Sequence, residues 1–195
     1  MRTRDELKEE TIREKAIELI VRKGFDGFSM QKLARAAGVS PATLYIYFKN
    51  REDLVNSLYN RVNQTFTRVA LENFSPQDTL EAGLWTQWKN RMRFILEYPD
   101  YYQFYEQFRN SPLILHEEVK SQDFKENMRE FVKNAIRRGE LTRIEPETFW
   151  ALAYGPFYTL MKFHLQGHSM MNEHYEITDA KLKALLKRVL ITLKS

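Results

Sequence analysis

Apolar residues recur every three or four positions along nearly the whole chain, which is the period of an amphipathic α-helix. The first such stretch covers residues 5–23 and places Ile12, Ala16 and Ile20 on one side. Gly24 follows directly, and glycine commonly ends a helix. No stretch alternates apolar and polar residues as a half-buried strand does, so the pattern predicts an all-α fold.

Two short helices are predicted next, separated by a tight turn. Ser29 and Ser40 are suitable N-caps for them, and Gly38 ends the first. Pro41 falls in the first turn of the second, where its missing N–H costs nothing. Asn50 then caps a longer fourth helix.

The remainder of the chain also has a helical pattern. Helices are predicted at 80–95, 124–136, 146–166 and 179–194. Prolines break the chain after Tyr98 and after Ser111, and Gly155-Pro156 predicts a kink. The stretch 146–166 is apolar on most faces, and such a helix is usually buried on most faces.

The turn between the two short helices has the layout of a helix-turn-helix motif. With Leu44 pointing inward and about 100° per residue, Phe48 also points inward. Ala42 and Ile46 then point outward, with Thr43 and Tyr45 on the flanks, so the outward face is small and uncharged and is bordered by hydroxyls. Such a face suits the DNA major groove, where methyl groups and hydroxyls meet base edges and phosphates. An ordinary helical hairpin in a core is the alternative, but it leaves the uncharged outer face unexplained.

The distribution of charge points the same way. The net charge is only +4, yet residues 27–51 contain no acid. The bases in this window are Lys32, Arg35, Lys49 and Arg51. Surfaces exposed to solvent normally mix both signs, so the window is a candidate footprint for an anion such as DNA phosphate, with chance clustering as the alternative.

Residues 12–55 resemble the DNA-binding domain of tetracycline-repressor (TetR) family transcriptional regulators. The resemblance rests on the run that begins at Gly24, GFDGFSMQKLARAAGVSPATLYIYFKNREDLV. It implies an N-terminal three-helix DNA-binding domain over residues 1–53. It also implies a helical domain over residues 54–195 that dimerises and encloses a small-molecule pocket.

The resemblance also implies roles for individual residues. The positions expected to contact DNA are Gln31, Ser40, Pro41, Ala42, Thr43, Tyr45, Ile46, Tyr47, Lys49 and Arg51. Thr43 matches a frequent DNA contact and Tyr45 a usual phosphate contact. Position 46 is often aromatic in the family and position 47 is often His, so Ile46 and Tyr47 depart from the pattern. The operator sequence therefore cannot be copied from a relative.

Aromatic and methionine side chains are dense in the second part of the chain. Those expected to line a ligand pocket are Trp85, Trp88, Tyr101, Tyr105, Phe108, Met128, Phe131, Trp150, Tyr154, Phe157 and Met161. Such a pocket would hold a small apolar or aromatic effector. For any single residue, packing in a core is the alternative. Arg91 and Arg93 could pair with a carboxylate of the effector, but such residues more often lie on a solvated face, which leaves the charge of the effector open.

Several other classes of site are not expected. The chain has no Cys, which excludes disulfides and thiol catalysis, and no catalytic or cofactor-binding motif occurs. His164 and His168 have a spacing that could hold a metal on one helix face, but no further ligand is evident, and no metal site is predicted. Without a signal peptide or a long apolar run, a soluble cytoplasmic protein is expected.

The sequence therefore predicts a ligand-responsive transcriptional repressor that binds a palindromic DNA operator as a homodimer. The apolar stretch 146–166 and the leucine stripe at 182–193 are expected to form the dimer interface, because the last helix has little of its own chain left to cover it. The alternative is a helical carrier protein for small molecules that does not read DNA. An all-helical enzyme is a third hypothesis that lacks any recognisable acid–base or metal constellation.

Overall fold

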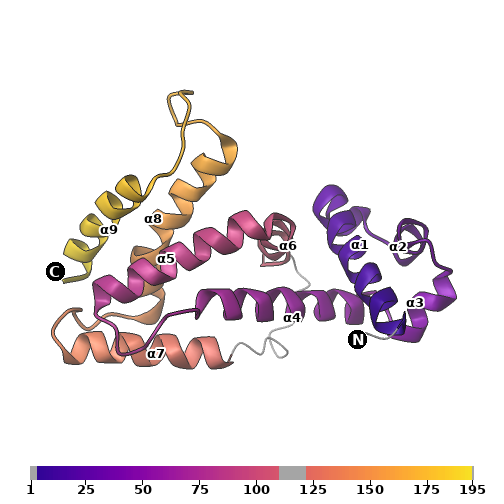
Figure 1. Ribbon diagram of the computed structural model, residues 1–195, viewed down its shortest axis with the longest axis horizontal. Coiled ribbons are helices and arrows are strands. Elements are labelled where there is room, and N and C mark those ends of the chain that lie inside the picture. The colour runs from indigo at the N-terminus through magenta and orange to yellow at the C-terminus, as the bar shows by residue number, and fades with distance from the viewer. Residues whose placement is uncertain (1–3, 110–121, 195) are drawn as a thin grey trace. The chain divides into compact units, whose positions relative to one another are not determined.

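The computed structural model describes residues 4–109 and 122–194, and these form nine α-helices (Figure 1). They are α1 (Arg4–Gly27), α2 (Met30–Ala37), α3 (Pro41–Tyr47), α4 (Arg51–Ala70), α5 (Leu80–Glu97), α6 (Pro99–Arg109), α7 (Gln122–Arg137), α8 (Pro146–Gln166) and α9 (Asp179–Lys194). The all-α prediction is confirmed. The break expected at Ser111-Pro112 lies outside the described residues. Within the described part of the chain, no helix is long and apolar enough to cross a bilayer.

The predicted caps of the short helices are confirmed. The Ser29 hydroxyl accepts the backbone N–H of Lys32, and Gly38 ends α2 with a left-handed φ of 66°. The Ser40 hydroxyl accepts the N–H of Thr43 at 3.1 Å. These local bonds satisfy backbone groups that a helix end otherwise leaves without partners.

The start of α4 is fixed by a pair of bonds of the same kind. The Asn50 side chain accepts the Asp53 N–H at 2.7 Å, and the Asp53 carboxylate accepts the Lys49 N–H at 2.9 Å. Two N–H groups at the start of the helix are therefore satisfied, although Asp53 accepts the N–H of the residue before Asn50 rather than that of Asn50 itself, as it would in a capping box.

The predicted end of the first helical stretch at Gly24 is confirmed. Gly24 has a φ of 68° and a ψ of 172°, which are not helical, and the rest of α1 up to Gly27 follows across this kink. The predicted helix over 146–166 is also confirmed as α8, which continues through Pro156.

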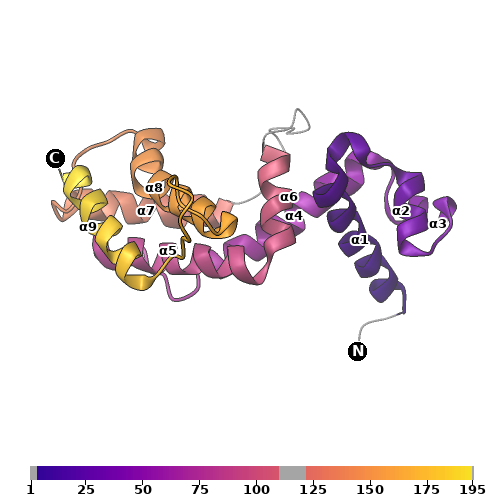
Figure 2. The ribbon, with the colours of Figure 1, turned by 90° about the horizontal axis from the view of Figure 1, so that it is seen from above.

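The chain divides into two compact units. The first unit takes the described residues within 1–66 and 94–121, and the second takes those within 67–93 and 122–195. In the first unit α1 packs against both α2 and α6 (Figure 2). Its fully buried side chains include Ile12, Ile20, Leu33, Leu58 and Phe104.

Buried polar side chains fix the end of α4 in the second unit. The side-chain amides of Gln87 and Asn90 donate to the carbonyl of Ala70 at 2.7 and 3.0 Å, and Asn90 also donates to the carbonyl of Glu72. The indole N–H of Trp88 donates to the carbonyl of Ala153 in α8 at 2.9 Å. These bonds tie α5 to the end of α4 on one side and to α8 on the other.

The leucine stripe of α9 is covered by its own chain. Leu186, Leu190 and Leu193 are buried in the single chain, where α9 packs along α8 (Figure 1). The prediction that these three residues have little cover within the monomer is therefore wrong. The large apolar side chains that stay exposed on the two helices are different ones, Trp150, Leu165 and Ile191.

Gly83 lets α5 approach α7 closely, and we expect Gly83→Ala to destabilise the protein. A Cβ at this position would lie 2.3 Å from the Phe131 ring, which is itself fully buried and cannot swing away freely. The expected loss in the free energy of unfolding is about 1–3 kcal/mol, the usual cost of overpacking. Urea unfolding measures it. Ala82→Ser, at the exposed neighbouring position, serves as the control, and equal effects of the two substitutions would contradict the close approach.

Candidate nucleic-acid interface and regulatory residues

Helix α3 presents the uncharged face that the helical wheel predicts. Leu44 and the following Phe48 are buried against the rest of the first unit. Ala42, Tyr45 and Ile46 are exposed, Ile46 to 78%. Burying this branched apolar side chain against another surface would be favourable, and the helix carries no charged residue that would oppose such a contact. This face is the strongest candidate for a contact with base edges.

Two hydroxyl groups at the start of α3 lie within hydrogen-bonding distance of each other. Ser40 Oγ and Thr43 Oγ1 lie 2.9 Å apart, and Pro41 is exposed beside them. Thr43 is half-buried, so its hydroxyl is held near the N-terminus of the helix rather than free to rotate. Hydroxyls and backbone N–H groups at such a position are suited to bind phosphate.

The two bases at the start of α4 differ in their surroundings. The Lys49 side chain is exposed, whereas Arg51 is half-buried. Arg51 Nη2 donates to the carbonyl of Phe25 at 2.7 Å, and its guanidinium lies 5.8 Å from the centre of the Phe28 ring. Arg51 therefore links α4 to the end of α1, while Lys49 is the better placed of the two to reach a phosphate.

Tyr47 turns toward α1 rather than outward with Tyr45. Its hydroxyl donates to the Asp5 carboxylate at 3.3 Å. Burial and the neighbouring carboxylate both raise the pKa of Tyr47. A phosphate next to Asp5 would be repelled, so this arrangement disfavours a phosphate contact by Tyr47.

Helix α2 adds exposed polar side chains to the same surface. Gln31, Lys32 and Arg35 are exposed, as expected for the acid-free window. Lys32 Nζ donates to the carbonyl of Gly27 at 2.7 Å, so this amine is partly engaged in holding the loop before α2. The predicted DNA contacts thus lie on α2, α3 and the first residues of α4.

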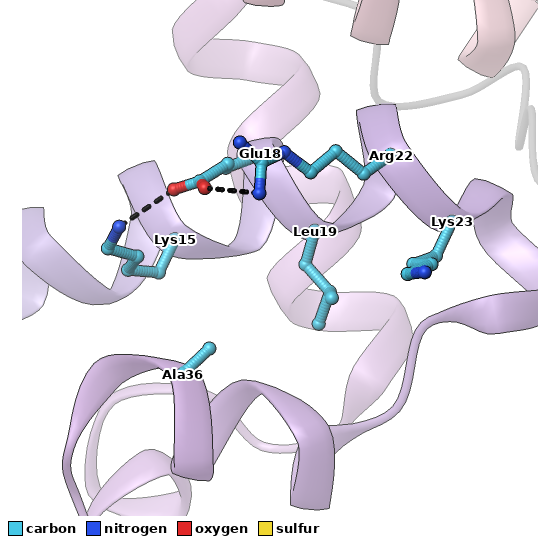
Figure 3. Close-up of a pocket in the computed structure, with 6 residues that line it drawn as sticks. All are labelled: Lys15, Glu18, Leu19, Arg22, Lys23 and Ala36. Carbon is cyan, nitrogen blue, oxygen red and sulfur yellow. Dashed lines mark hydrogen bonds and ion pairs between the residues drawn. The ribbon is translucent and has the colours of Figure 1, made fainter.

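A shallow pocket of about 200 Å³ lies between α1 and α2 (Figure 3). Its lining consists of Lys15, Glu18, Leu19, Arg22, Lys23 and Ala36. Glu18 pairs with Lys15 at 2.7 Å and with Arg22 at 3.4 Å, and the bond from Lys15 lowers the pKa of Glu18. This charged, small pocket does not suit the apolar effector that the sequence predicts.

A hydrogen-bonded network joins α1, α4 and α6 within the first unit. Arg61 of α4 pairs with Glu10 of α1, and its Nε donates to the Tyr101 hydroxyl of α6 at 2.9 Å. The same hydroxyl donates to Glu14 at 2.9 Å. Glu10, Arg61 and Tyr101 are half-buried or buried, whereas Glu14 is exposed. The pair between Arg61 and Glu10 is therefore less hydrated than a surface pair. The network fixes α6 to the helix that also supports α2.

The residues predicted to line a ligand pocket fall into two groups. Tyr101, Tyr105 and Phe108 lie on α6 in the first unit, where Phe108 stacks on Tyr59 at 4.4 Å between ring centres. The others lie in the second unit: Trp85, Trp88, Met128, Phe131, Trp150, Tyr154, Phe157 and Met161. Most of this second group is buried, but Trp85 is half-buried and Trp150 is 36% exposed.

Arg91 of α5 is enclosed by aromatic rings in the second unit. The expectation of a solvated Arg91 is wrong, because only 1% of it is exposed. Its Cζ lies 4.2 to 5.9 Å from the centres of four rings, those of Tyr154, Trp150, Phe124 and Tyr158. Its Nη1 donates to the Tyr158 hydroxyl at 2.8 Å. Burial raises the pKa of Tyr154 to about 12, although the nearby guanidinium acts to lower it.

The burial of Arg91 could have been found from the sequence. Leu84, Trp88 and Ile95 are buried on α5, and Arg91 lies on the same stripe at helical spacing. Its charge suggested solvent, but its position in the pattern pointed to the core. Arg93 lies off that stripe and pairs with Glu72 at 2.7 Å.

The histidine pair expected at helical spacing does not share one helix face. Helix α8 ends before Gly167, which adopts a left-handed φ of 75°. His168 therefore lies in the following loop, whereas His164 remains on the helix and accepts the Ile177 N–H. Among the residues that the structure describes, no group of three or more His, Cys, Asp or Glu side chains could hold a metal ion.

Residues 12–58 match the family model of bacterial regulatory proteins, tetR family. Among curated proteins, the chain is 31% identical over 94 residues to an HTH-type transcriptional regulator of Haemophilus influenzae, covering 48% of this chain and 50% of that protein. It is 33% identical over 69 residues to the Fatty acid metabolism regulator protein of Bacillus subtilis, covering 35% and 36%. The matched regions thus span half or less of these relatives.

Solved structures resemble the whole chain. A TetR family transcription regulator from Marinobacter aquaeolei VT8 has a TM-score of 0.85 and 28% identity, with 99% of this chain and 98% of that chain covered. A TetR-family transcriptional regulator from Haemophilus influenzae RD has a TM-score of 0.79 and 21% identity, with both chains fully covered. The second likeness shows the fold alone.

Arg51→Ala should destabilise the protein in the absence of DNA, and Lys49→Ala should not. Loss of the bond to the Phe25 carbonyl should lower the free energy of unfolding by about 1–3 kcal/mol, as is typical for a hydrogen bond to a charged group. The exposed Lys49 should change it by less than about 0.5 kcal/mol. Urea unfolding of both variants measures the difference, and the same loss in both would show that Arg51 does not link α4 to α1.

Proposed function

Because the chain belongs to the tetR family of bacterial regulatory proteins, we propose that it is a ligand-responsive transcriptional repressor that binds a palindromic DNA operator as a homodimer. The observation that carries the proposal is the exposed, uncharged face of α3. Bases and hydroxyls border that face, and the surrounding sequence window contains no acid.

The contacts with DNA divide by chemistry. Ile46 and Ala42 are suited to apolar contact with a thymine methyl in the major groove. Lys49, Tyr45 and the hydroxyls at the start of α3 are suited to phosphates, which position the protein without reading sequence. In this proposal residues 1–53 form the DNA-binding domain and residues 54–195 the regulatory domain.

The aromatic side chains around Arg91 support an effector site in the second unit. Rings from α7 and α8 surround the guanidinium, and Trp150 is partly exposed beside them. In this proposal an apolar or aromatic molecule contacts these rings, and the buried cation favours one that also carries an acidic group.

The network around Arg61 supports a route from α6 to the DNA-reading helix within the first unit. Tyr101 of α6 and Glu14 of α1 are joined directly, so a displacement of α6 would strain the helix on which α2 packs. The network also holds α4 through Arg61. A shift of α6 would thereby reorient the reading helix and release the operator.

The exposed faces of α8 and α9 support dimerisation. Ala151, Gly155 and Thr159 are exposed at intervals of four on α8, and small side chains at this spacing allow another helix to approach closely. Leu165 and Ile191 add exposed apolar surface on the same two helices. Two copies joined through these faces would form a four-helix bundle.

Selection of random duplexes by the purified full chain tests the proposed function. We expect enrichment of one motif with two half-sites related by a twofold axis, since one short helix makes too few base contacts alone. Sequencing the bound fraction over successive rounds measures the enrichment. No enriched motif would favour a helical carrier protein, and a motif without twofold symmetry would count against the homodimer.

A further inference from the structure

The segment that joins α8 to α9, residues 167–175, is an ordered hairpin, here called the α8–α9 hairpin. Three backbone bonds hold it: Tyr175 N–H to Gly167 O at 3.1 Å, Ser169 N–H to Glu173 O at 2.8 Å and Asn172 N–H to Ser169 O at 3.0 Å. Asn172 has a φ of 58°. A turn followed by one left-handed residue is a common three-residue hairpin connection. The segment therefore has a defined shape of its own, and Figure 1 shows it projecting beyond the ends of α8 and α9.

The base of the α8–α9 hairpin is fixed to both helices. The Tyr175 ring packs against Phe163 of α8 with 5.9 Å between centres, and Lys181 of α9 lies over the same ring at 4.5 Å. Lys181 Nζ also donates to the carbonyl of Glu176 at 2.6 Å. These contacts hold the base of the hairpin in place, and with it the side chains farther along the hairpin.

Two histidines face each other across the α8–α9 hairpin. His168 and His174 form an antiparallel bridge, and the backbone bonds flank them on both sides. They are therefore a non-hydrogen-bonded pair, whose side chains lie on one side of the hairpin with Cβ atoms about 4.5–5.5 Å apart. Both are exposed. Two imidazoles at this separation can bind the same cation.

The tip of the α8–α9 hairpin carries two exposed methionines. Met170 is 84% exposed and Met171 is 81% exposed, more than any other large apolar residue described. They occupy the centre of the turn, where Asp, Asn, Ser, Pro or Gly is usual. Neither side chain contributes to the core, so packing gives no reason for apolar residues here.

We propose that the α8–α9 hairpin binds one soft monovalent cation, copper(I) or the chemically similar silver(I). The imidazoles of His168 and His174 and a thioether sulfur from Met170 or Met171 are the ligands. Thioethers select copper(I) among biological metals, and imidazole suits copper as well. A zinc site needs three or four imidazole, thiolate or carboxylate ligands, and the described residues bring no such group together.

The arrangement also explains why the methionines are adjacent at the tip. A methionine side chain has three rotatable bonds and a polarisable sulfur, so either thioether can adapt to a cation held by the two imidazoles. The site is independent of α3 and of the rings around Arg91.

Competition for copper(I) tests the proposal. The purified full chain is titrated anaerobically with copper(I) in the presence of bicinchoninate, whose coloured complex reports the metal that the protein does not hold. We expect the wild-type chain to withdraw one equivalent. His168→Ala combined with His174→Ala should weaken binding at least about tenfold. Met170→Leu combined with Met171→Leu keeps apolar side chains of similar size and should also weaken it.

Two further measurements keep the result interpretable. His164→Gln alters an imidazole on α8 outside the hairpin and should leave copper(I) binding unchanged. Titration with zinc(II) should give weaker binding than copper(I) in the wild-type chain. The proposal is overturned if the double histidine variant withdraws as much copper(I) as the wild type, if the double methionine variant binds unchanged, or if zinc(II) binds as tightly as copper(I).

Discussion

A helix of seven residues is too short to be stable in water through its own hydrogen bonds, so α3 depends on what anchors it. Two features provide the anchor. The Ser40 cap satisfies its first turn, and Leu44 and Phe48 bury one side of it against the first unit. Arg13 of α1 adds a contact, with its guanidinium 5.4 Å from the centre of the Phe48 ring. With one side fixed in this way, the opposite side must face outward.

Because the short helices need support from the rest of the unit, α1 is the central element of the first unit. It packs against α2, and its carboxylates at Glu10 and Glu14 hold Arg61 and Tyr101. Arg51 ties the start of α4 to the carbonyl of Phe25 near the kink in α1. Our proposal that α6 transmits a signal to DNA rests on this shared support. In this proposal a displacement of α6 is passed to α1, and α1 also contacts Phe48 at the end of α3. One helix therefore connects α6 to α3.

The sequence predicted the local structure of this unit well, because that structure is set by neighbouring residues. Helix caps such as Ser29 and Asn50 bond to backbone groups three positions along the chain. Gly38 ends α2 because glycine adopts the left-handed conformation easily. The inward and outward sides of α3 follow from helical periodicity alone. These features needed no knowledge of distant parts of the chain.

The remaining features depend on contacts between distant residues, which periodicity alone does not reveal. The charge of Arg91 predicts a solvated side chain, but rings from α7 and α8, which are distant in the sequence, enclose it. The engagement of Arg51 with Phe25 is set by how α1 and α4 pack. His168 pairs with His174 only because α8 ends at Gly167 and the chain turns back.

The central claim is that the outward side of α3 reads bases, and a change at Ile46 tests it most directly. Duplexes selected by the wild-type chain are compared with those selected by Ile46→Asn, since asparagine can bond adenine where isoleucine can only touch a methyl group. The account predicts the same half-site spacing with a changed base preference at one position in each half-site. Identical motifs for the two proteins, with equal affinity, would contradict it.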